Sequence, residues 1–292
     1  MIIDFHTHIF PDKIAGKTIE ALGTLAGVKA ATDGTLNGLL DSMEKSGVDR
    51  SVIMPVCTKP EQFESINAFA KKVNDTYKGK LLSFGGIHPD CENYKEKLAY
   101  IKSLGLPGIK IHPDYQKVMI DDVRFMRIIE YASELGLIIL THAGIDIGLP
   151  EPVHCQPDKM RKVLDIIQPE KMLLAHLGGW KQWDMVYEYL AGENVYLDTA
   201  FLFGVGMKEN YLSEDNEKDR SSLVNHYNYM EQDMFFKILE KHNFKKVLFA
   251  TDSPWSDAKA GIEYIRSLPV SEEVKERILG GNALELLGIS ML

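Results

Sequence analysis

The sequence predicts an α/β protein of the (β/α)8 class, the TIM barrel, with extra helices after the last strand. Three observations predict this class. Short apolar runs recur eight times in the 292-residue chain, helical patterns separate them, and most runs are apolar throughout instead of alternating with polar residues. Strands of a parallel sheet that is buried on both faces have this pattern, and a barrel of eight such strands occupies about 250 residues.

The predicted strands are short and rich in Ile, Val and Leu. They are Ile2–Phe5, Ser51–Pro55, Leu81–Ile87, Gly108–Ile111, Leu137–Leu140, Met172–Ala175, Val195–Leu197 and Val247–Ala250. The predicted helices are Leu36–Lys45, Glu61–Tyr77, Tyr94–Ser103, Asp122–Glu134, Lys159–Ile167, Trp183–Leu190, Met230–Lys241, Ser256–Ser267, Ser271–Leu279 and Asn282–Leu287. Several of these helices end at a glycine, as Lys45-Ser46-Gly47 does, and glycine commonly terminates a helix.

No linker divides the chain, so we expect one domain over residues 1–292. Residues 204–229 break the alternation, because this segment after the seventh strand is long and polar. A βα loop of this length is typical of a lid, a dimer contact or a solvated surface segment. A doubly wound open sheet uses the same alternation of strands and helices and remains the alternative fold.

Charge and composition exclude several classes of partner. The net charge of -9 and the pI near 5.5 argue against binding to nucleic acid or to an anionic membrane surface. No run approaches the 18 or so apolar residues of a membrane span, and the first strand begins too early for a signal peptide. Cys57, Cys91 and Cys155 show no Cys-x-x-Cys spacing, which favours a reduced, cytoplasmic setting, although one disulfide stays open.

The first strand runs directly into His6-Thr7-His8. Strand side chains alternate between two faces, so His6 and His8 project from the same face, about 7 Å apart at their Cα atoms. Neutral imidazole is the commonest metal ligand, and two neighbouring imidazoles form half of a site for one divalent ion. Taken alone, such a pair is more often a coincidence than a metal site.

Further polar residues occur at or just after the carboxyl ends of later strands. They are His88, Lys110, His112, His142, His176 and Asp252, with His154 in a nearby loop. Barrel active sites lie at this end of the strands, and scattered structural histidines would show no such preference. The joint placement therefore predicts an active site.

The residue types favour a catalytic metal site. His6, His8 and His142 would supply nitrogen ligands, and Asp252 would ligate the ion or polarise a bound water. This donor set suits one divalent ion, with Zn²⁺ expected first and Mn²⁺, Fe²⁺ or Co²⁺ as alternatives. His176 would lie beside the metal-bound water as a general base or an orienting group.

These residues also carry a family resemblance. In chain order the matching segments are Asp-x-His-x-His, Gly-Ile-Lys-x-His-Pro, Thr-His-Ala-Gly, Ala-His-Leu-Gly-Gly, Thr-Asp-Ser-Pro-Trp and Gly-Asn-Ala-x-x-Leu-Leu-Gly. The whole chain resembles the amidohydrolase superfamily, specifically the amidohydrolase-related or "family 2" branch that includes aminocarboxymuconate-semialdehyde decarboxylase-like proteins. The resemblance implies a distorted barrel with one divalent metal, and it suggests a homodimer.

The resemblance also implies roles for single residues. His6, His8 and His142 match the metal ligands, His176 matches the catalytic histidine, and Asp252 matches the metal-bound aspartate that shuttles protons. Lys110 stands about where some superfamily hydrolases carry a metal-bridging lysine. In this branch such a lysine is not normally a bridge, so Lys110 is expected to contact a substrate carboxylate or to form a structural ion pair.

The remaining candidates each have two interpretations. His88 and His112 bind substrate or fix their loops. Trp255, with Trp180, Phe201 and Phe203, gives the pocket a flat apolar wall or packs in the core. All four aromatic residues follow strand ends.

Two reactions fit this machinery, both on a small-molecule substrate. A non-oxidative decarboxylase of a small unsaturated or aromatic acid needs cationic groups for its carboxylate, ideally arginine. Only Arg220 and Lys59 look reachable from the expected site. We therefore expect a metal-dependent hydrolase of a lactone, amide or cyclic ester, with Asp252 as proton shuttle and His176 polarising the carbonyl. The decarboxylase is the first alternative, and a catalytically silent metal-binding barrel is the second.

Overall fold

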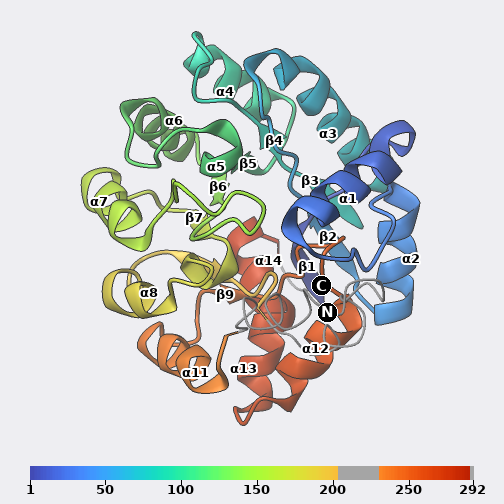
Figure 1. Cartoon of the computed structure of the whole chain (residues 1–292), viewed down its shortest axis with the longest axis vertical. Coiled ribbons are helices and arrows are strands. Elements are labelled where there is room, and N and C mark those ends of the chain that lie inside the picture. The colour runs from blue at the N-terminus through green and yellow to red at the C-terminus, as the bar shows by residue number, and fades with distance from the viewer. Residues whose placement is uncertain (203–229, 290–292) are drawn as a thin grey trace.

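The computed structural model describes residues 1–202 and 230–289, and its strands occupy the centre of a ring of helices (Figure 1). The strands are β1 (Ile3–Thr7), β2 (Arg50–Ile53), β3 (Leu81–Ser83), β4 (Gly85–Gly86), β5 (Gly108–Ile111), β6 (Ile138–Thr141), β7 (Met172–Leu174), β8 (Tyr196–Asp198) and β9 (Val247–Leu248). All their pairings are parallel and join consecutive strands. The predicted (β/α)8 class is confirmed, and the consecutive order differs from that of a doubly wound sheet, in which the order reverses.

The ring of strands is irregular at two places. The predicted third strand is interrupted at Phe84, which separates β3 from β4 and divides the strands into a three-stranded and a six-stranded sheet. The Phe84 amide donates to the carbonyl of Ile53 over 2.9 Å, so the chain stays beside β2 across the break. At the other junction, the Phe5 amide donates to the Phe249 carbonyl over 3.0 Å. The first and last strands therefore lie side by side.

The helices follow the predicted pattern with small shifts at their ends. They are α2 (Leu36–Ser46), α3 (Phe63–Tyr77), α4 (Tyr94–Ser103), α5 (Pro113–Gln116), α6 (Val123–Glu134), α7 (Pro157–Ile167), α8 (Trp183–Tyr189), α11 (Gln232–Lys241), α12 (Ala258–Ser267), α13 (Glu272–Glu276) and α14 (Asn282–Leu287). Short 3₁₀ turns occupy Pro60–Gln62 and His176–Gly178, and a π-helical turn, Arg277–Gly281, joins α13 to α14. The expected lid or dimer contact at residues 204–229 falls outside the described residues.

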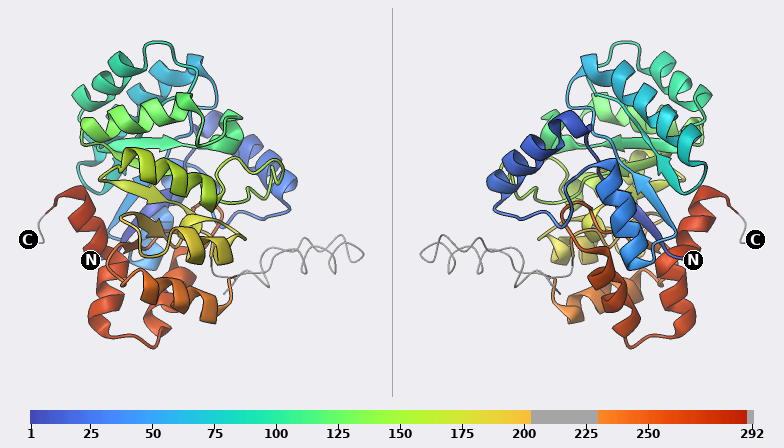
Figure 2. Two further views of the ribbon diagram at one scale, coloured as in Figure 1. Left: turned by 90° about the vertical axis from the view of Figure 1, so that its left-hand side faces the viewer. Right: turned by 90° about the vertical axis from the view of Figure 1, so that its right-hand side faces the viewer.

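Two helices were not predicted, the four-residue α5 and the longer α1. α1 (Asp12–Ala26) is inserted between β1 and α2 and ends at Gly27, whose φ of 66° lies in the left-handed region. Figure 2 shows α1 and α14 at opposite ends of the barrel. α1 thus covers the carboxyl end of the strands, where the predicted site lies.

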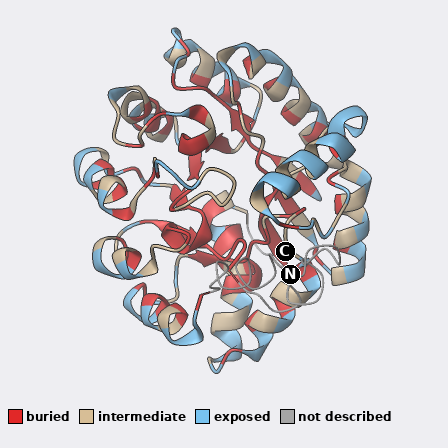
Figure 3. Ribbon diagram, in the orientation of Figure 1, coloured by how far each residue is buried: buried red, intermediate tan, exposed pale blue. Residues whose placement is uncertain are grey.

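The barrel interior and the surrounding layer have separate cores, and burial is concentrated on the strands and on the inner helix faces (Figure 3). Phe5, Leu140 and Leu173 belong to the inner core. Ala283 and Leu284 of α14 join the same cluster. An apolar plug therefore fills the amino end of the barrel and leaves the carboxyl end for polar groups.

Among the described residues, no helix is long and apolar enough to cross a membrane. Cys57, Cys91 and Cys155 are all buried and free.

Candidate metal centre

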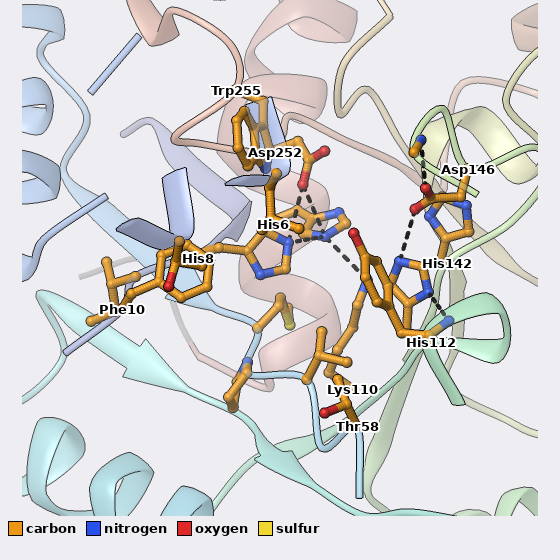
Figure 4. Close-up of a pocket in the computed structure, with 18 of the residues that line it drawn as sticks. His6, His8, Phe10, Thr58, Lys110, His112, His142, Asp146, Asp252 and Trp255 are labelled. Atoms are coloured by element: carbon orange, nitrogen blue, oxygen red, sulfur yellow. Dashed lines mark hydrogen bonds and ion pairs between the residues drawn. The ribbon is translucent and has the colours of Figure 1, made fainter. Parts of the chain in front are cut away.

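A cavity of about 750 Å³ opens at the carboxyl ends of the strands (Figure 4). The predicted residues that line it are His6, His8, Lys110, His112, His142, His176, Asp252 and Trp255, together with Trp180 and Phe201. His88 is not among the described lining residues; its Nδ1 accepts a hydrogen bond from the Asp90 amide over 3.1 Å. Lys59 is exposed and also outside the lining. Phe203 and Arg220 lie outside the described residues.

His6, His8 and Asp252 form the first group of candidate ligands. The Nε2 atoms of the two histidines are 3.2 Å apart, and Asp252 Oδ1 lies 3.1 Å from that of His8 and 3.5 Å from that of His6. With metal–ligand bonds of about 2.1 Å, neighbouring ligand atoms are roughly 3.0 Å apart in an octahedral site and about 3.4 Å apart in a tetrahedral one. These three atoms therefore have the spacing of ligands on one face of a metal's coordination shell.

β1 and a neighbouring carboxylate orient His6. The register of β1 against β2 shifts between Asp4 and Thr7, and such a bulge redirects the side chains that follow it. His6 Nδ1 donates to Asp198 Oδ2 over 2.9 Å, which leaves the lone pair on Nε2. Burial, and then the charge of Lys110, hold the His6 pKa well below its ordinary value, so the ring stays neutral, as a ligand must be.

Asp252 follows β9 with a φ of 62°, and its amide donates to the His6 carbonyl over 2.8 Å. Burial alone would raise the pKa of this carboxyl. The hydrogen bond and charge of His8, with the charges of His176 and Lys110, outweigh burial and lower the pKa below its ordinary value. Asp252 is therefore ionised at neutral pH, as ligation requires.

His142 and His176 form a hydrogen-bonded pair that has a defined direction. A carbonyl oxygen only accepts, so His176 Nδ1 donates to Ala200 O over 2.9 Å. With one proton on each ring, His176 Nε2 then accepts from His142 Nδ1 over 3.1 Å. His142 Nε2 carries a free lone pair and is buried without a hydrogen-bond partner. A metal ion is one way to satisfy such an atom.

The structure does not bring His142 into the first group. It assigns His142 to a second group with His112 and Asp146. The rings of His112 and His142 are stacked, with centroids 4.2 Å apart and planes 8° apart. A metal binds an imidazole nitrogen in the plane of its ring, so one ion cannot lie in both of these stacked planes. We conclude that the second group is not a site in which both rings bind one ion.

Lys110 lies between the two groups. Its side chain is buried, and Nζ donates to His6 Nε2 over 3.1 Å. Burial lowers its pKa to about 8, against the opposing attraction of Asp252, Asp198 and Asp146. It is the one lysine or arginine in the described lining.

Carboxylates that were not predicted from the sequence also support the site. Asp198, at the end of β8, holds His6 and also accepts from the amides of His176 and Ala200. Asp114 accepts from His154 Nδ1 over 3.0 Å, and its other oxygen lies 3.8 Å from His142 Nε2. An aspartate directly after the apolar run Val195–Leu197 was a usable signal for Asp198, because buried charge in a strand is rare unless it is paired.

A glycine fixes the loop that carries His142. Gly144 has a φ of 83°, and a Cβ there would lie 2.1 Å from the backbone nitrogen of Trp180. The Trp180 amide donates to the Ala143 carbonyl over 2.9 Å, which joins the loops after β6 and β7. The Thr-His-Ala-Gly segment thus ends in glycine because two backbones meet there.

Solved structures of similar fold cover almost the whole chain. A 5-carboxyvanillate decarboxylase from Sphingomonas paucimobilis matches with a TM-score of 0.66 and 15% identity over 99% of each chain. A 2,6-dihydroxybenzoate decarboxylase in complex with 2,6-dihydroxybenzoate matches with a TM-score of 0.68 and 12% identity over 99% of each chain. A dihydroxybenzoic acid decarboxylase from Polaromonas sp. JS666, with bound manganese and the inhibitor 2-nitroresorcinol, has a TM-score of 0.67 and 13% identity over 98% of this chain and 96% of its own.

No curated protein matches this sequence. The model of a protein family described as amidohydrolase matches residues 3–289, in agreement with the resemblance carried by the histidine motifs. The chain belongs to the amidohydrolase family.

Proposed function

We propose that the protein is a metal-dependent carboxy-lyase, which removes CO2 from an unsaturated or aromatic acid. The observation that carries the proposal is Lys110, a buried cation beside three candidate metal ligands and the one lysine or arginine in the described lining of the pocket. A substrate carboxylate is the group that such a cation binds. The decarboxylases of similar fold support the proposal, which favours the first alternative of the sequence analysis over the expected hydrolase.

His6, His8 and Asp252 would hold one divalent ion, with His142 as a candidate fourth ligand after a movement of its ring. When bound, the ion supplies Lewis acidity for the substrate oxygens. The two imidazoles and one carboxylate suit Zn²⁺, which the sequence analysis expects first, and equally Mn²⁺, which the Polaromonas enzyme holds.

The chain's own residues account for the remaining requirements. Lys110 binds and orients the carboxylate. The bond between the carboxylate carbon and its neighbour breaks, and its electron pair stays on the neighbouring carbon as CO2 leaves. His176 Nε2, which accepts a hydrogen bond from His142 in the free protein, would first take up a proton from solvent and then deliver it to that carbon. Asp252 stays ionised and serves as a ligand.

The test is CO2 release from hydroxybenzoic and unsaturated acids by protein loaded with Mn²⁺ or Zn²⁺. His176→Asn and Asp252→Asn should each lower kcat by at least a hundredfold, as for removal of a general acid or a metal ligand. Lys110→Met should raise KM more than it lowers kcat. The exposed Lys59→Met is the matched control and should leave both constants unchanged. Turnover that survives both His176→Asn and Asp252→Asn would refute the assignment.

Hydrolysis remains the second candidate because Asp252 is ionised and the described lining holds no arginine. In that reaction Asp252 takes a proton from the attacking water and passes it to the leaving group. Acid release from lactones and cyclic amides in a pH-stat, with the same preparations, separates the two reactions. Neither CO2 nor acid release from any compound would favour the silent metal-binding barrel.

A further inference from the structure

Among the described lining residues, the outer part of the pocket carries no charge. All acidic, basic and histidine side chains of the described lining belong to the two ligand groups, or contact them as Lys110 and His176 do. The other described lining residues are apolar or neutral. A substrate that meets Lys110 with its carboxylate must therefore place an uncharged part against the remaining walls, because a second charge there would be desolvated without a partner.

α1 supplies one of these walls. Its lining residues are Ile14, Thr18, Leu22 and Ala26, which recur every four positions and so lie on one face of the helix. Ala15 is the one residue of α1 that is fully buried, so the face that lines the cavity is not packed completely into the core. Ile14 remains 50% exposed.

The start of α3, with the 3₁₀ turn before it, supplies a second wall. Ile66 and Phe69 of α3 line the cavity three positions apart, with the neutral Gln62 and Ser65 beside them. Ile66 is also close to the backbone of β4, where its Cγ2 would lie 3.1 Å from a Cβ at Gly86. This wall is therefore held against the barrel.

The size of the cavity exceeds what one aromatic ring needs. Its volume is about 750 Å³, whereas a cavity of about 150 Å³ is enough to bind benzene. A single-ring acid held at Lys110 would leave most of the apolar wall without a contact. Volumes of about 300–1,000 Å³ are typical of sites for drug-sized ligands.

We propose that the walls formed by α1 and the start of α3 are a subsite for an apolar group larger than one ring. Together with the proposed function, on which the position of the carboxylate rests, this subsite defines the substrate class as a carboxylic acid with an uncharged two-ring or alkyl body. α1 is then the element that sets substrate size.

The subsite can be tested with 2-naphthol and phenol, which lack the carboxylate and undergo no decarboxylation. 2-Naphthol should bind the metal-loaded protein at least tenfold more tightly than phenol, as measured by naphthol fluorescence and by competition. Leu22→Gln should weaken naphthol binding at least fivefold and phenol binding less. Leu25→Gln, on the same helix but 56% exposed and outside the described lining, is the matched control and should change neither.

A misfolded variant would lose affinity, so a substitution that is expected to raise the affinity for naphthol excludes misfolding as the cause of its effect. Thr18→Val keeps the side-chain shape and removes a hydroxyl group from the wall, so naphthol should bind at least twofold more tightly. Equal affinity for phenol and naphthol, or equal effects of Leu22→Gln and Leu25→Gln, would overturn the subsite whatever reaction the protein performs. If naphthol binding follows the pattern while no acid releases CO2, the subsite stands and the carboxy-lyase proposal fails.

Discussion

Two imidazoles at the site, those of His6 and His176, have their Nδ1 nitrogen held by an oxygen atom. Asp198 accepts from His6 Nδ1, and the carbonyl of Ala200 accepts from His176 Nδ1. These contacts fix the tautomer and the ring plane before any ligand arrives. A sequence motif can name such histidines, but it does not show which nitrogen is free.

We expect Asp198→Asn to lower metal affinity by about 10–100-fold, the usual effect of removing a carboxylate behind a ligating histidine. An amide can accept the same hydrogen bond but does not raise the basicity of the ring. Titration of the metal-free protein with Zn²⁺ or Mn²⁺ measures the change. The exposed Asp184→Asn serves as control, and equal affinities for the two variants would show that Asp198 does not support the metal centre.

Residue types at strand ends predicted much of this site, because parallel strands bring their carboxyl ends to one place. His6, His8 and Asp252 meet as expected. The position of His142 against His112 could not be predicted, since ring stacking depends on loop geometry. Asp114 and Asp146 were missed for a related reason: neither the four-residue α5, which carries Asp114, nor the loop that carries Asp146 has a repeating pattern that places its aspartate near a histidine.

Among the helices and strands, those with a clear hydrophobic pattern were predicted well, whereas short elements and those with a weak pattern were not. Strands buried on both faces gave continuous apolar runs, so seven of the eight need only small shifts at their ends, and only Leu81–Ile87 is divided. α1 was missed because it packs little against the core. Its apolar residues face a cavity, and two glycines, Gly16 and Gly23, weaken its helical pattern.

His242 links α11 to the turn before β8 and should make stability depend on pH. Its Nε2 donates to Val195 O and its Nδ1 accepts from the Gly192 amide, while burial lowers its pKa. The folded state therefore holds the ring neutral, and the unfolded state takes up a proton below about pH 6.5. The free energy of unfolding should fall as pH drops through that range, by up to about 1.4 kcal/mol per pH unit for this residue.

The measurement is urea unfolding of metal-free protein at pH 8 and pH 5. His242→Gln should be less stable than the natural protein at pH 8, and the gap should narrow at pH 5. A gap that stays constant over this range would exclude His242 as a contributor to the pH dependence. The histidines of the site are present in both proteins, so their contribution to the pH dependence of stability cancels in the comparison.

For the whole molecule, one contact joins the beginning of the chain to its end. The Asp4 carboxylate accepts from the Thr251 hydroxyl over 2.6 Å and from the Thr251 amide over 3.0 Å. Burial raises the Asp4 pKa to about 7, despite these hydrogen bonds. The contact lies where β1 and β9 meet, which is the place where the ring of strands is completed.

Thr251→Val should lower the free energy of unfolding by about 1–3 kcal/mol, the effect of leaving a buried acceptor without one donor. Urea unfolding measures it. The control is Thr76→Val, whose hydroxyl donates to Lys72 O on an exposed helix face and whose loss should change stability by less than about 0.5 kcal/mol. Equal effects of the two variants would show that the junction contact contributes no more to stability than an exposed hydrogen bond does.

The homodimer that the family resemblance suggests stays a prediction.

The candidate ligands come from opposite ends of the sequence, and this separation has a consequence for biosynthesis. His6 and His8 leave the ribosome before Asp252, which follows more than two hundred residues later. Under the proposed ligation by His6, His8 and Asp252, the two histidines alone would make a weak pair, and the nascent chain would bind an ion firmly only after β9 has been synthesised and has docked beside β1. Tight metal binding would therefore require a completely folded barrel. A chain truncated before Asp252 would bind the ion too weakly to compete with other metal-binding molecules in the cell.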